Sequence, residues 1–182
     1  MVGGPLPHVM AAKAVALAEA SQPSFGKYAA AVVDNARVLA EGLTAGGVAV
    51  MTGGTDNHLV LVDVRRFGLN GRQAESALRA AGITTNRNVV PDETNSPCYT
   101  SGLRLGTPAV TTLGMGADEM REIAEVLLTV LHTTSPGVVT SGPNRGKPSL
   151  VQFRLDDAIA EATRSRVADL LARHPLYPEI EL

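Results

Sequence analysis

An arginine between two glycines is the clearest candidate for a binding group in this chain. Arg104 lies in the segment 101–108, and Gly102 and Gly106 stand two residues to either side of it. Because side chains alternate along a strand, all three residues would share one face, with open space beside the guanidinium. A guanidinium binds a carboxylate or a phosphate through two parallel hydrogen bonds. The pattern predicts an anion site; an arginine paired with an internal acid at a strand end is the plainer alternative.

Two further segments could contact a ligand. The opening Gly3-Gly4-Pro5-Leu6 precedes a predicted helix, where glycine amides can approach a phosphate closely, although such turns are also common without any ligand. The polar loop over residues 86–100 leads into the Arg104 strand; long loops are often functional, yet many are only solvated connections. Its Cys98 has no basic or histidine neighbour in sequence, which favours an inert thiol over a nucleophile.

Several other kinds of site are not expected from residue type and spacing. The four histidines lack the spacing of metal ligands, so we expect no metal site. The sequence has no nucleophile elbow, P-loop or dinucleotide-binding fingerprint. A Schiff-base lysine needs desolvation or a cationic neighbour. The lysines of this chain lie in alanine-rich or polar surroundings; they are Lys13, Lys27 and Lys147.

Composition indicates an ordinary globular chain with no nucleic-acid or membrane partner. The 182 residues are 45% hydrophobic, and their net charge of −2 comes from acids and bases that are mixed along the chain. Neither a basic surface for nucleic acid nor one for anionic lipid is therefore expected. No apolar run approaches the roughly 18 residues of a membrane span, and we expect no signal peptide. A single cysteine fits a reducing compartment, so we expect a cytoplasmic protein.

The elements that must position these residues alternate between helix and strand. The predicted helices cover residues 8–20, 25–46, 71–81, 118–132 and 156–173. The predicted strands cover residues 48–51, 58–64, 83–86, 102–105 and 150–153. Asn70 and Gln73 have capping-box spacing at the start of one helix. In the strand at 58–64 both alternating sets are largely apolar, so we expect it to be covered on both faces.

This order of elements predicts an α/β chain of the two-layer α+β kind. We expect a small, mostly antiparallel sheet with helices packed on one side. Residues 1–45 would form the glycine turn and an interdomain helical segment, and residues 46–182 the C-terminal α/β domain. Within that domain, residues 133–148 are rich in Ser, Thr, Gly and Pro and are expected to form a flexible, solvent-exposed loop.

Taken together, these segments resemble the serine hydroxymethyltransferases. The motifs that carry the resemblance are, in chain order, Gly3-Gly4-Pro5-Leu6, Thr52-Gly53-Gly54-Thr55-Asp56-Asn57-His58, Gly82-Ile83-Thr84, Asn86-Arg87-Asn88, Ser96-Pro97 and Thr100–Ala109. They stand in the order and at the spacing of the family over residues 3–132, and the second and last motifs are highly specific. Departures from the usual pattern occur at Val2, Pro7, Cys98 and Tyr99.

The resemblance implies the C-terminal small domain of a fold-type I pyridoxal-phosphate enzyme. Such an enzyme interconverts serine and glycine with tetrahydrofolate, in one-carbon metabolism and glycine biosynthesis, as a homodimer or tetramer. Arg104 corresponds to the arginine that holds the carboxylate of the amino acid. Gly3 and Gly4 correspond to glycines that meet the cofactor phosphate across the dimer interface. The positions that correspond to the folate site are Asn88, Ser96, Pro97 and Cys98.

The resemblance also implies that this chain lacks the cofactor lysine. In the family that lysine lies in a histidine–lysine block that precedes the Gly3-Gly4 motif. Bond cleavage next to the α-carbon leaves a carbanion, and the pyridine ring of the cofactor is its electron sink. Arg104 can orient a carboxylate but cannot supply that sink. We therefore expect a fragment that is inactive alone; the alternative is a free-standing, non-catalytic binding or docking domain derived from the enzyme.

Overall fold

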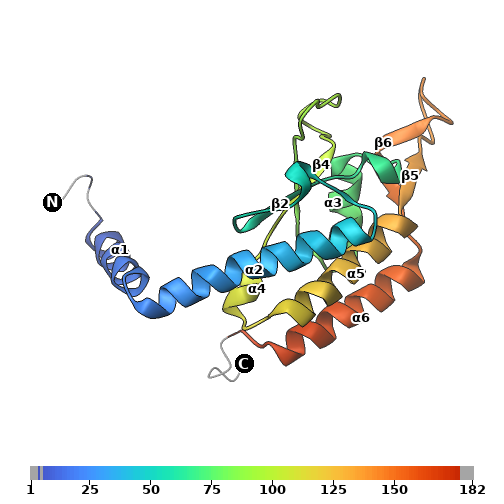
Figure 1. Cartoon of the computed structure of the whole chain (residues 1–182). Helices are drawn as coiled ribbons and strands as arrows, with labels where there is room; N and C mark the ends of the chain where they lie inside the picture. The colour runs from blue at the N-terminus through green and yellow to red at the C-terminus, as the bar shows by residue number, and fades with distance from the viewer. Residues whose placement is uncertain (1–3, 5, 177–182) are drawn as a thin grey trace.

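Residues 4 and 6–176, which the computed structural model describes, alternate between helices and strands (Figure 1). The helices are α1 (Pro7–Ala20), α2 (Pro23–Ala45), α3 (Gly71–Ala80), α4 (Pro108–Thr112), α5 (Ala117–Thr133) and α6 (Asp157–Arg173). The strands are β1 (Ala49–Val50), β2 (Leu59–Asp63), β3 (Asn86–Asn88), β4 (Gly102–Gly106), β5 (Ser135–Val138) and β6 (Pro148–Arg154). Short 3-10 turns follow β1 and β2, at Met51–Gly53 and Arg65–Phe67.

Four of the strands form one antiparallel sheet, and helices cover one of its faces. The order across the sheet is β1-β2-β4-β3. Val60 and Val62 of β2 and Leu103 of β4 are buried toward the helices, in a core that also contains Leu43 of α2 and Met120 of α5. The helix layer has α5 between α2 and α6 (Figure 1). These features confirm the expected α/β chain with a small antiparallel sheet and helices on one side.

The start of α3 shows how the sequence sets an element boundary. The Asn70 side chain accepts a hydrogen bond from the Gln73 amide at 2.9 Å, and the Gln73 side chain accepts one from the Asn70 amide at 3.0 Å. This reciprocal pair confirms the predicted capping box. At the other end, Ile83 donates its amide to the Leu78 carbonyl at 2.8 Å, and Gly82 adopts a φ of 86°. Because residues 82 and 83 complete the helix terminus, β3 begins at Asn86 and not at the predicted residue 83.

The expectation that the strand at 58–64 is covered on both faces is wrong for this chain. Leu59 is 37% exposed and Leu61 is half-buried, because both point away from the helix layer. We call this second side, which bears Leu59, Leu61 and Arg104, the open face of the sheet. An apolar pattern on both sides of a strand indicates burial but does not say which element provides the cover.

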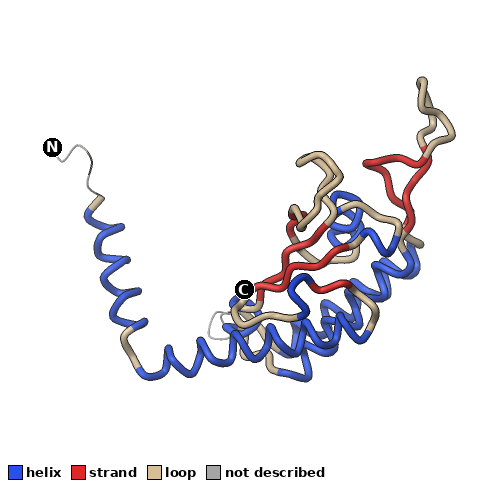
Figure 2. Tube along the Cα trace, turned by 45° about the horizontal axis from the view of Figure 1, so that its top comes forward, coloured by secondary structure: helices blue, strands red, loops and turns tan. Residues whose placement is uncertain are grey.

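The prediction of a flexible loop over residues 133–148 is wrong for the first part of that segment. Ser135–Val138 forms β5, which pairs with β6 in a two-stranded hairpin that projects from the domain (Figures 1 and 2). Val139 extends the pairing, since its amide donates to the Lys147 carbonyl at 3.0 Å. A composition of Ser, Thr, Gly and Pro is typical of hairpin turns as well as of loops. The short helix α4, which Pro108 begins, was also not predicted.

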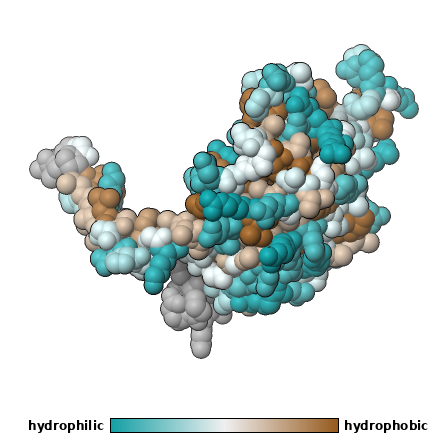
Figure 3. All heavy atoms as spheres, viewed as in Figure 1, coloured by the Kyte–Doolittle hydropathy of each residue, from teal (hydrophilic) through white to brown (hydrophobic). Residues whose placement is uncertain are grey.

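The first helices form an arm that extends away from the sheet (Figures 1 and 2). No residue of α1 is buried, and apolar atoms lie on the surface of the arm (Figure 3). Leu17 is 71% exposed and Met10 is 62% exposed. The second half of α2, in contrast, enters the core through Leu39 and Leu43. Within residues 4 and 6–176, no helix combines the length and apolarity that would span a membrane.

Candidate functional site

Arg104 lies at the centre of β4, on the open face of the sheet. Register places it between Leu61 of β2 and Asn86 of β3, and its side chain is exposed. Its Nη2 lies 3.5 Å from the Asn86 Oδ1. No carboxylate among the described residues lies within 4.0 Å of its guanidinium. The alternative of an arginine paired with an internal acid therefore finds no partner in the described part of the chain.

The two glycines beside Arg104 differ in their surroundings. A Cβ at Gly106 would have ordinary contacts, the nearest being 3.5 Å from the Leu59 Cδ2. At Gly102 a Cβ would lie 2.7 Å from the Val62 carbonyl oxygen and nearer still to the Val90 side chain. The open space expected beside the guanidinium is therefore present on the Gly106 side only. Gly102 is needed instead for the close approach of β2, β3 and the loop that follows β3.

The polar loop of the sequence analysis begins beside Arg104. Asn88, the last residue of β3, pairs in register with Gly102 and so shares the open face. Ser96, Pro97 and Cys98 form an exposed turn, closed by hydrogen bonds from the Tyr99 and Thr100 amides to the Ser96 carbonyl at 2.9 and 3.0 Å. This turn ends just before β4. The structure thus brings Asn88 beside the strand that carries Arg104, whereas the described turn of Ser96, Pro97 and Cys98 makes no hydrogen bond to that strand.

The glycine motif is not brought to this site. Gly4 precedes α1, the first helix of the arm, and an added Cβ there would meet nothing within 4 Å. Gly3 lies outside the described residues. The alanine-rich helix that follows has no side-chain cap and no buried residue. Nothing within the described residues therefore closes around Gly4 to form a phosphate cradle.

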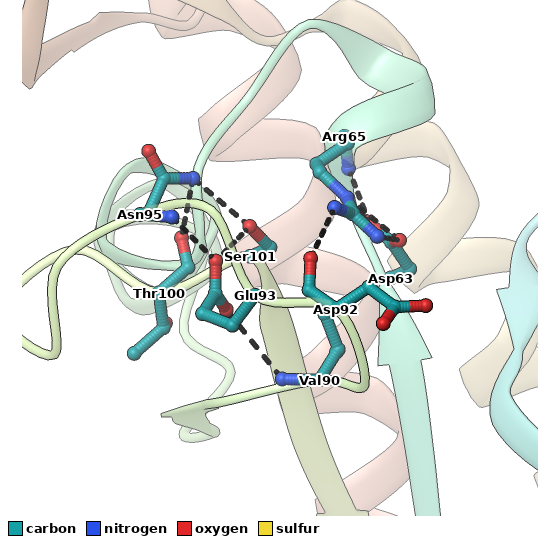
Figure 4. Close-up of polar contacts among 8 residues, drawn as sticks. All are labelled: Asp63, Arg65, Val90, Asp92, Glu93, Asn95, Thr100 and Ser101. Atoms are coloured by element: carbon teal, nitrogen blue, oxygen red, sulfur yellow. Dashed lines mark hydrogen bonds and ion pairs between the residues drawn. The ribbon is translucent and has the colours of Figure 1, made fainter.

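The structure reveals one carboxylate that the sequence analysis did not single out. Glu93 accepts hydrogen bonds from the Ser101 hydroxyl at 2.5 Å and from the Asn95 amide at 2.8 Å (Figure 4). Asn95 in turn donates to the Ser101 Oγ at 2.9 Å. Burial alone would raise the pKa of Glu93, but the hydrogen bonds from Ser101 and the backbone amides outweigh it and hold that pKa below its ordinary value. The spacing of Glu93 and Ser101 carries no recognised motif, so no local signal predicted the contact.

A second cluster flanks the same loop. Arg65 forms a two-pronged ion pair with Asp63, with distances of 2.6 Å from Nη2 to Oδ2 and 3.1 Å from Nε to Oδ1 (Figure 4). The hydrogen bonds that Arg65 donates to the Asp63 carboxylate raise the pKa of Arg65 above its ordinary value. Its Nη1 also donates to the Asp92 carbonyl at 3.3 Å. Arg65 is therefore already paired, whereas the exposed Arg104 guanidinium has no carboxylate partner among the described residues and can take an external anion.

Fold and site together define a small α/β domain whose open face carries Arg104, an exposed arginine without a carboxylate partner among the described residues. A family model described as serine hydroxymethyltransferase matches residues 1–127 of the chain. The chain belongs to the serine hydroxymethyltransferase family. This finding confirms the resemblance drawn from the motifs.

Curated relatives match the chain from end to end. The serine hydroxymethyltransferase of Salinispora tropica is 52% identical over 182 residues, which is 100% of this chain and 37% of the relative. That of Mycolicibacterium smegmatis is also 52% identical, over 35% of its length. That of Chlamydia trachomatis serovar D is 50% identical, over 36% of its length. The chain thus spans little more than a third of the length of the curated relatives it matches.

Proposed function

We propose that these 182 residues are the C-terminal portion of a serine hydroxymethyltransferase, a transferase that interconverts serine and glycine with tetrahydrofolate. The observation that carries the proposal is Arg104, an exposed arginine on the open face of the sheet with no carboxylate partner among the described residues. Family membership supplies the reaction. The cytoplasm, where serine, glycine and folate are available, is the proposed compartment.

Arg104 would bind and orient the carboxylate of the amino acid. A guanidinium can donate two parallel hydrogen bonds to a carboxylate, which fixes both the position and the plane of that group. Asn86, whose Oδ1 lies 3.5 Å from the Arg104 Nη2, would steady the side chain from the neighbouring strand. Such orientation reduces the entropy that the substrate must lose before it reacts.

The folate and phosphate assignments are extensions of the same proposal. Asn88 and the turn of Ser96, Pro97 and Cys98 would line the folate site; the shared face of Asn88 and Arg104 supports this placement. Gly3 and Gly4 would meet the phosphate of pyridoxal phosphate in a dimer or tetramer. The exposed position of Gly4 is compatible with contact to another subunit.

We further propose that the chain by itself is inactive. Pyridoxal phosphate would supply the electron sink for bond cleavage. The residues described here do not fit that cofactor on their own: Lys13, Lys27 and Lys147 are all exposed, whereas a Schiff-base lysine is activated by desolvation or by a neighbouring cation. With pyridoxal phosphate and serine added, the isolated chain should form no glycine. A stable cofactor adduct that maps to one of the three lysines would contradict this expectation.

A segment exchange tests the functional assignment. In the Salinispora tropica relative, the matched segment is replaced by these 182 residues; we call the product the exchange protein. At 52% identity over the full segment, we expect the exchange protein to fold and to convert serine to glycine with tetrahydrofolate. A folded but inactive exchange protein would argue against the proposal.

The alternative, a non-catalytic docking domain, is favoured by one observation. The arm formed by α1 and the start of α2 exposes apolar side chains, among them Met10, Leu17 and Phe25. Large exposed apolar surfaces commonly mark protein–protein contacts. Docking as the sole function would predict that the isolated chain binds a complete transferase while the exchange protein stays inactive.

A further inference from the structure

We propose that Glu93 is a positioning residue, which holds the 89–100 loop against the start of β4 and thereby fixes the turn of Ser96, Pro97 and Cys98 relative to Arg104. The contacts by which Glu93 holds the loop are seen in the structure itself. Tetrahydrofolate as the ligand of the loop rests on the proposed function.

The Glu93 carboxylate contacts Ser101, just before β4, and two backbone amides of its own loop. One carboxylate oxygen accepts a hydrogen bond from the hydroxyl of Ser101, the residue directly before β4. The same oxygen accepts a second hydrogen bond from the backbone amide of Asn95, within the loop. The other oxygen lies 3.5 Å from the Val90 amide at the start of the loop (Figure 4). One carboxylate therefore connects the start of the loop, its middle and the strand. Hydrogen bonds to an ionised acceptor are about twice as strong as neutral ones.

The loop has little else to hold its middle. Val90 is the only apolar residue of the loop that is buried, at 3% exposure, and Val89 is 48% exposed. The final residues are fastened separately, because the Gly71 and Arg72 amides of α3 donate to the Thr100 and Tyr99 carbonyls. Between these two ends, the chain is held by the polar contacts of Glu93 and Asn95, with the one hydrogen bond from Arg65 to the Asp92 carbonyl.

The backbone turns sharply at both ends of this polar segment. Asp92 and Thr100 have φ values of 55° and 56°, in the left-handed region that non-glycine residues seldom adopt. Such conformations persist where surrounding contacts hold them in place. Ser101 is fully buried, and its hydroxyl oxygen also accepts a hydrogen bond from the side-chain Nδ2 of Asn95. Loss of the Glu93 carboxylate would free the segment between the two turns, which contains Ser96, Pro97 and Cys98.

The position of the only cysteine makes the loop directly observable. Cys98 is exposed, so a nitroxide spin label can be attached to the unaltered chain at that residue. The electron paramagnetic resonance spectrum then reports the mobility of the turn. The test variant is Glu93→Gln, which keeps the shape of the side chain but removes its charge and one of its acceptor oxygens.

A matched control lies one residue away. Asp92→Asn removes a negative charge from the same loop, and asparagine tolerates a positive φ as aspartate does. The Asp92 carboxylate makes no hydrogen bond within the described residues; only its backbone carbonyl is used, by Arg65. We expect Glu93→Gln to increase label mobility and Asp92→Asn to leave the spectrum unchanged.

Hydrogen exchange provides a second measurement, which reports directly on the hydrogen bond from the Asn95 amide to Glu93. In Glu93→Gln the backbone amide of Asn95 should exchange its hydrogen on the order of tenfold faster, because a neutral amide oxygen accepts a hydrogen bond about half as strongly as a carboxylate. Ser101→Ala, a smaller change at a fully buried site, should act in the same direction and serves if Glu93→Gln does not fold. An unchanged spectrum and unchanged exchange in either folded variant would overturn the positioning role.

The effect of Glu93 on substrate binding is tested in a separate experiment. In the exchange protein, Glu93→Gln should raise the KM for tetrahydrofolate and leave the KM for serine unchanged, a split that a general loss of stability would not produce. Equal effects on both substrates would refute a role specific to the folate side. The spin-label measurement needs no folate. If the folate assignment fails, the measurement therefore still shows whether Glu93 holds the loop.

Discussion

Replacement of Gly102 by alanine should destabilise the protein, although the change adds a single methyl group. The added Cβ would lie 2.7 Å from the Val62 carbonyl oxygen, closer than such atoms approach in folded proteins, and at a tight 3.0 Å from the Asn88 carbonyl oxygen. Both oxygens belong to the backbone of neighbouring strands, so they cannot move aside as a flexible side chain would. The sheet must therefore shift, and Val90 with it.

The same strand offers a matched comparison at Gly106. There the nearest atom to an added Cβ is the Leu59 Cδ2 at 3.5 Å, an ordinary contact. Overpacking typically costs about 1–3 kcal/mol, whereas alanine in place of an unstrained glycine in a strand gains roughly 0.5–1 kcal/mol through the unfolded state. We expect Gly102→Ala to lose about 2 kcal/mol or more and Gly106→Ala to lose nothing.

Urea unfolding followed by circular dichroism measures the difference. With a slope of about 2 kcal/mol per molar urea, Gly102→Ala should lower the transition midpoint by about 1 M, and Gly106→Ala should leave it in place or raise it. Equal midpoints for the two variants would refute the reasoning, because it rests on the unequal space beside the two glycines.

Three further predictions concern the elements around the site. Glu119 accepts a hydrogen bond from the Gly116 amide at the start of α5, and this bond lowers the pKa of Glu119. Glu119→Gln should therefore reduce the free energy of unfolding by about 1 kcal/mol at pH 7. Thermal unfolding against pH should show this difference shrink below about pH 4.5, as the native carboxylate takes up its proton. Gln73 donates to the Ser149 carbonyl at 2.6 Å, so Gln73→Ala should cost about 2 kcal/mol in urea unfolding by separating α3 from β6. Deletion of residues 1–20 should change the free energy of unfolding by less than about 0.5 kcal/mol, since α1 buries no residue; a larger loss would show that α1 packs on the domain.

Much of the fold follows from local patterns in the sequence. The apolar spacing along α2 and α5 predicts both helices, and the Asn70–Gln73 pair marks the start of α3 within a residue. Such signals succeed because they depend on neighbours three or four positions apart. The hairpin of β5 and β6 was missed because its composition is shared by turns and loops, and only pairing between distant residues distinguishes them.

The sequence predicts only the part of the site that depends on local patterns. Strand alternation correctly places Arg104 on the face opposite Leu103, which is buried. It cannot show that Val90 closes the space at Gly102, since that contact depends on the path of the loop. Glu93 has no local signature either, because its acceptor role arises where the loop folds back on Ser101.

The role of Arg104 can be measured most directly in the exchange protein. Arg104→Gln is compared with Arg145→Gln, which removes an exposed arginine from the turn between β5 and β6. Loss of a charged partner for a bound carboxylate costs about 2–5 kcal/mol, so Arg104→Gln should lower kcat/KM for serine on the order of a hundredfold or more, while Arg145→Gln leaves it unchanged. A value for Arg104→Gln equal to that of the Arg145 control would contradict the assignment of Arg104 as the carboxylate-binding residue.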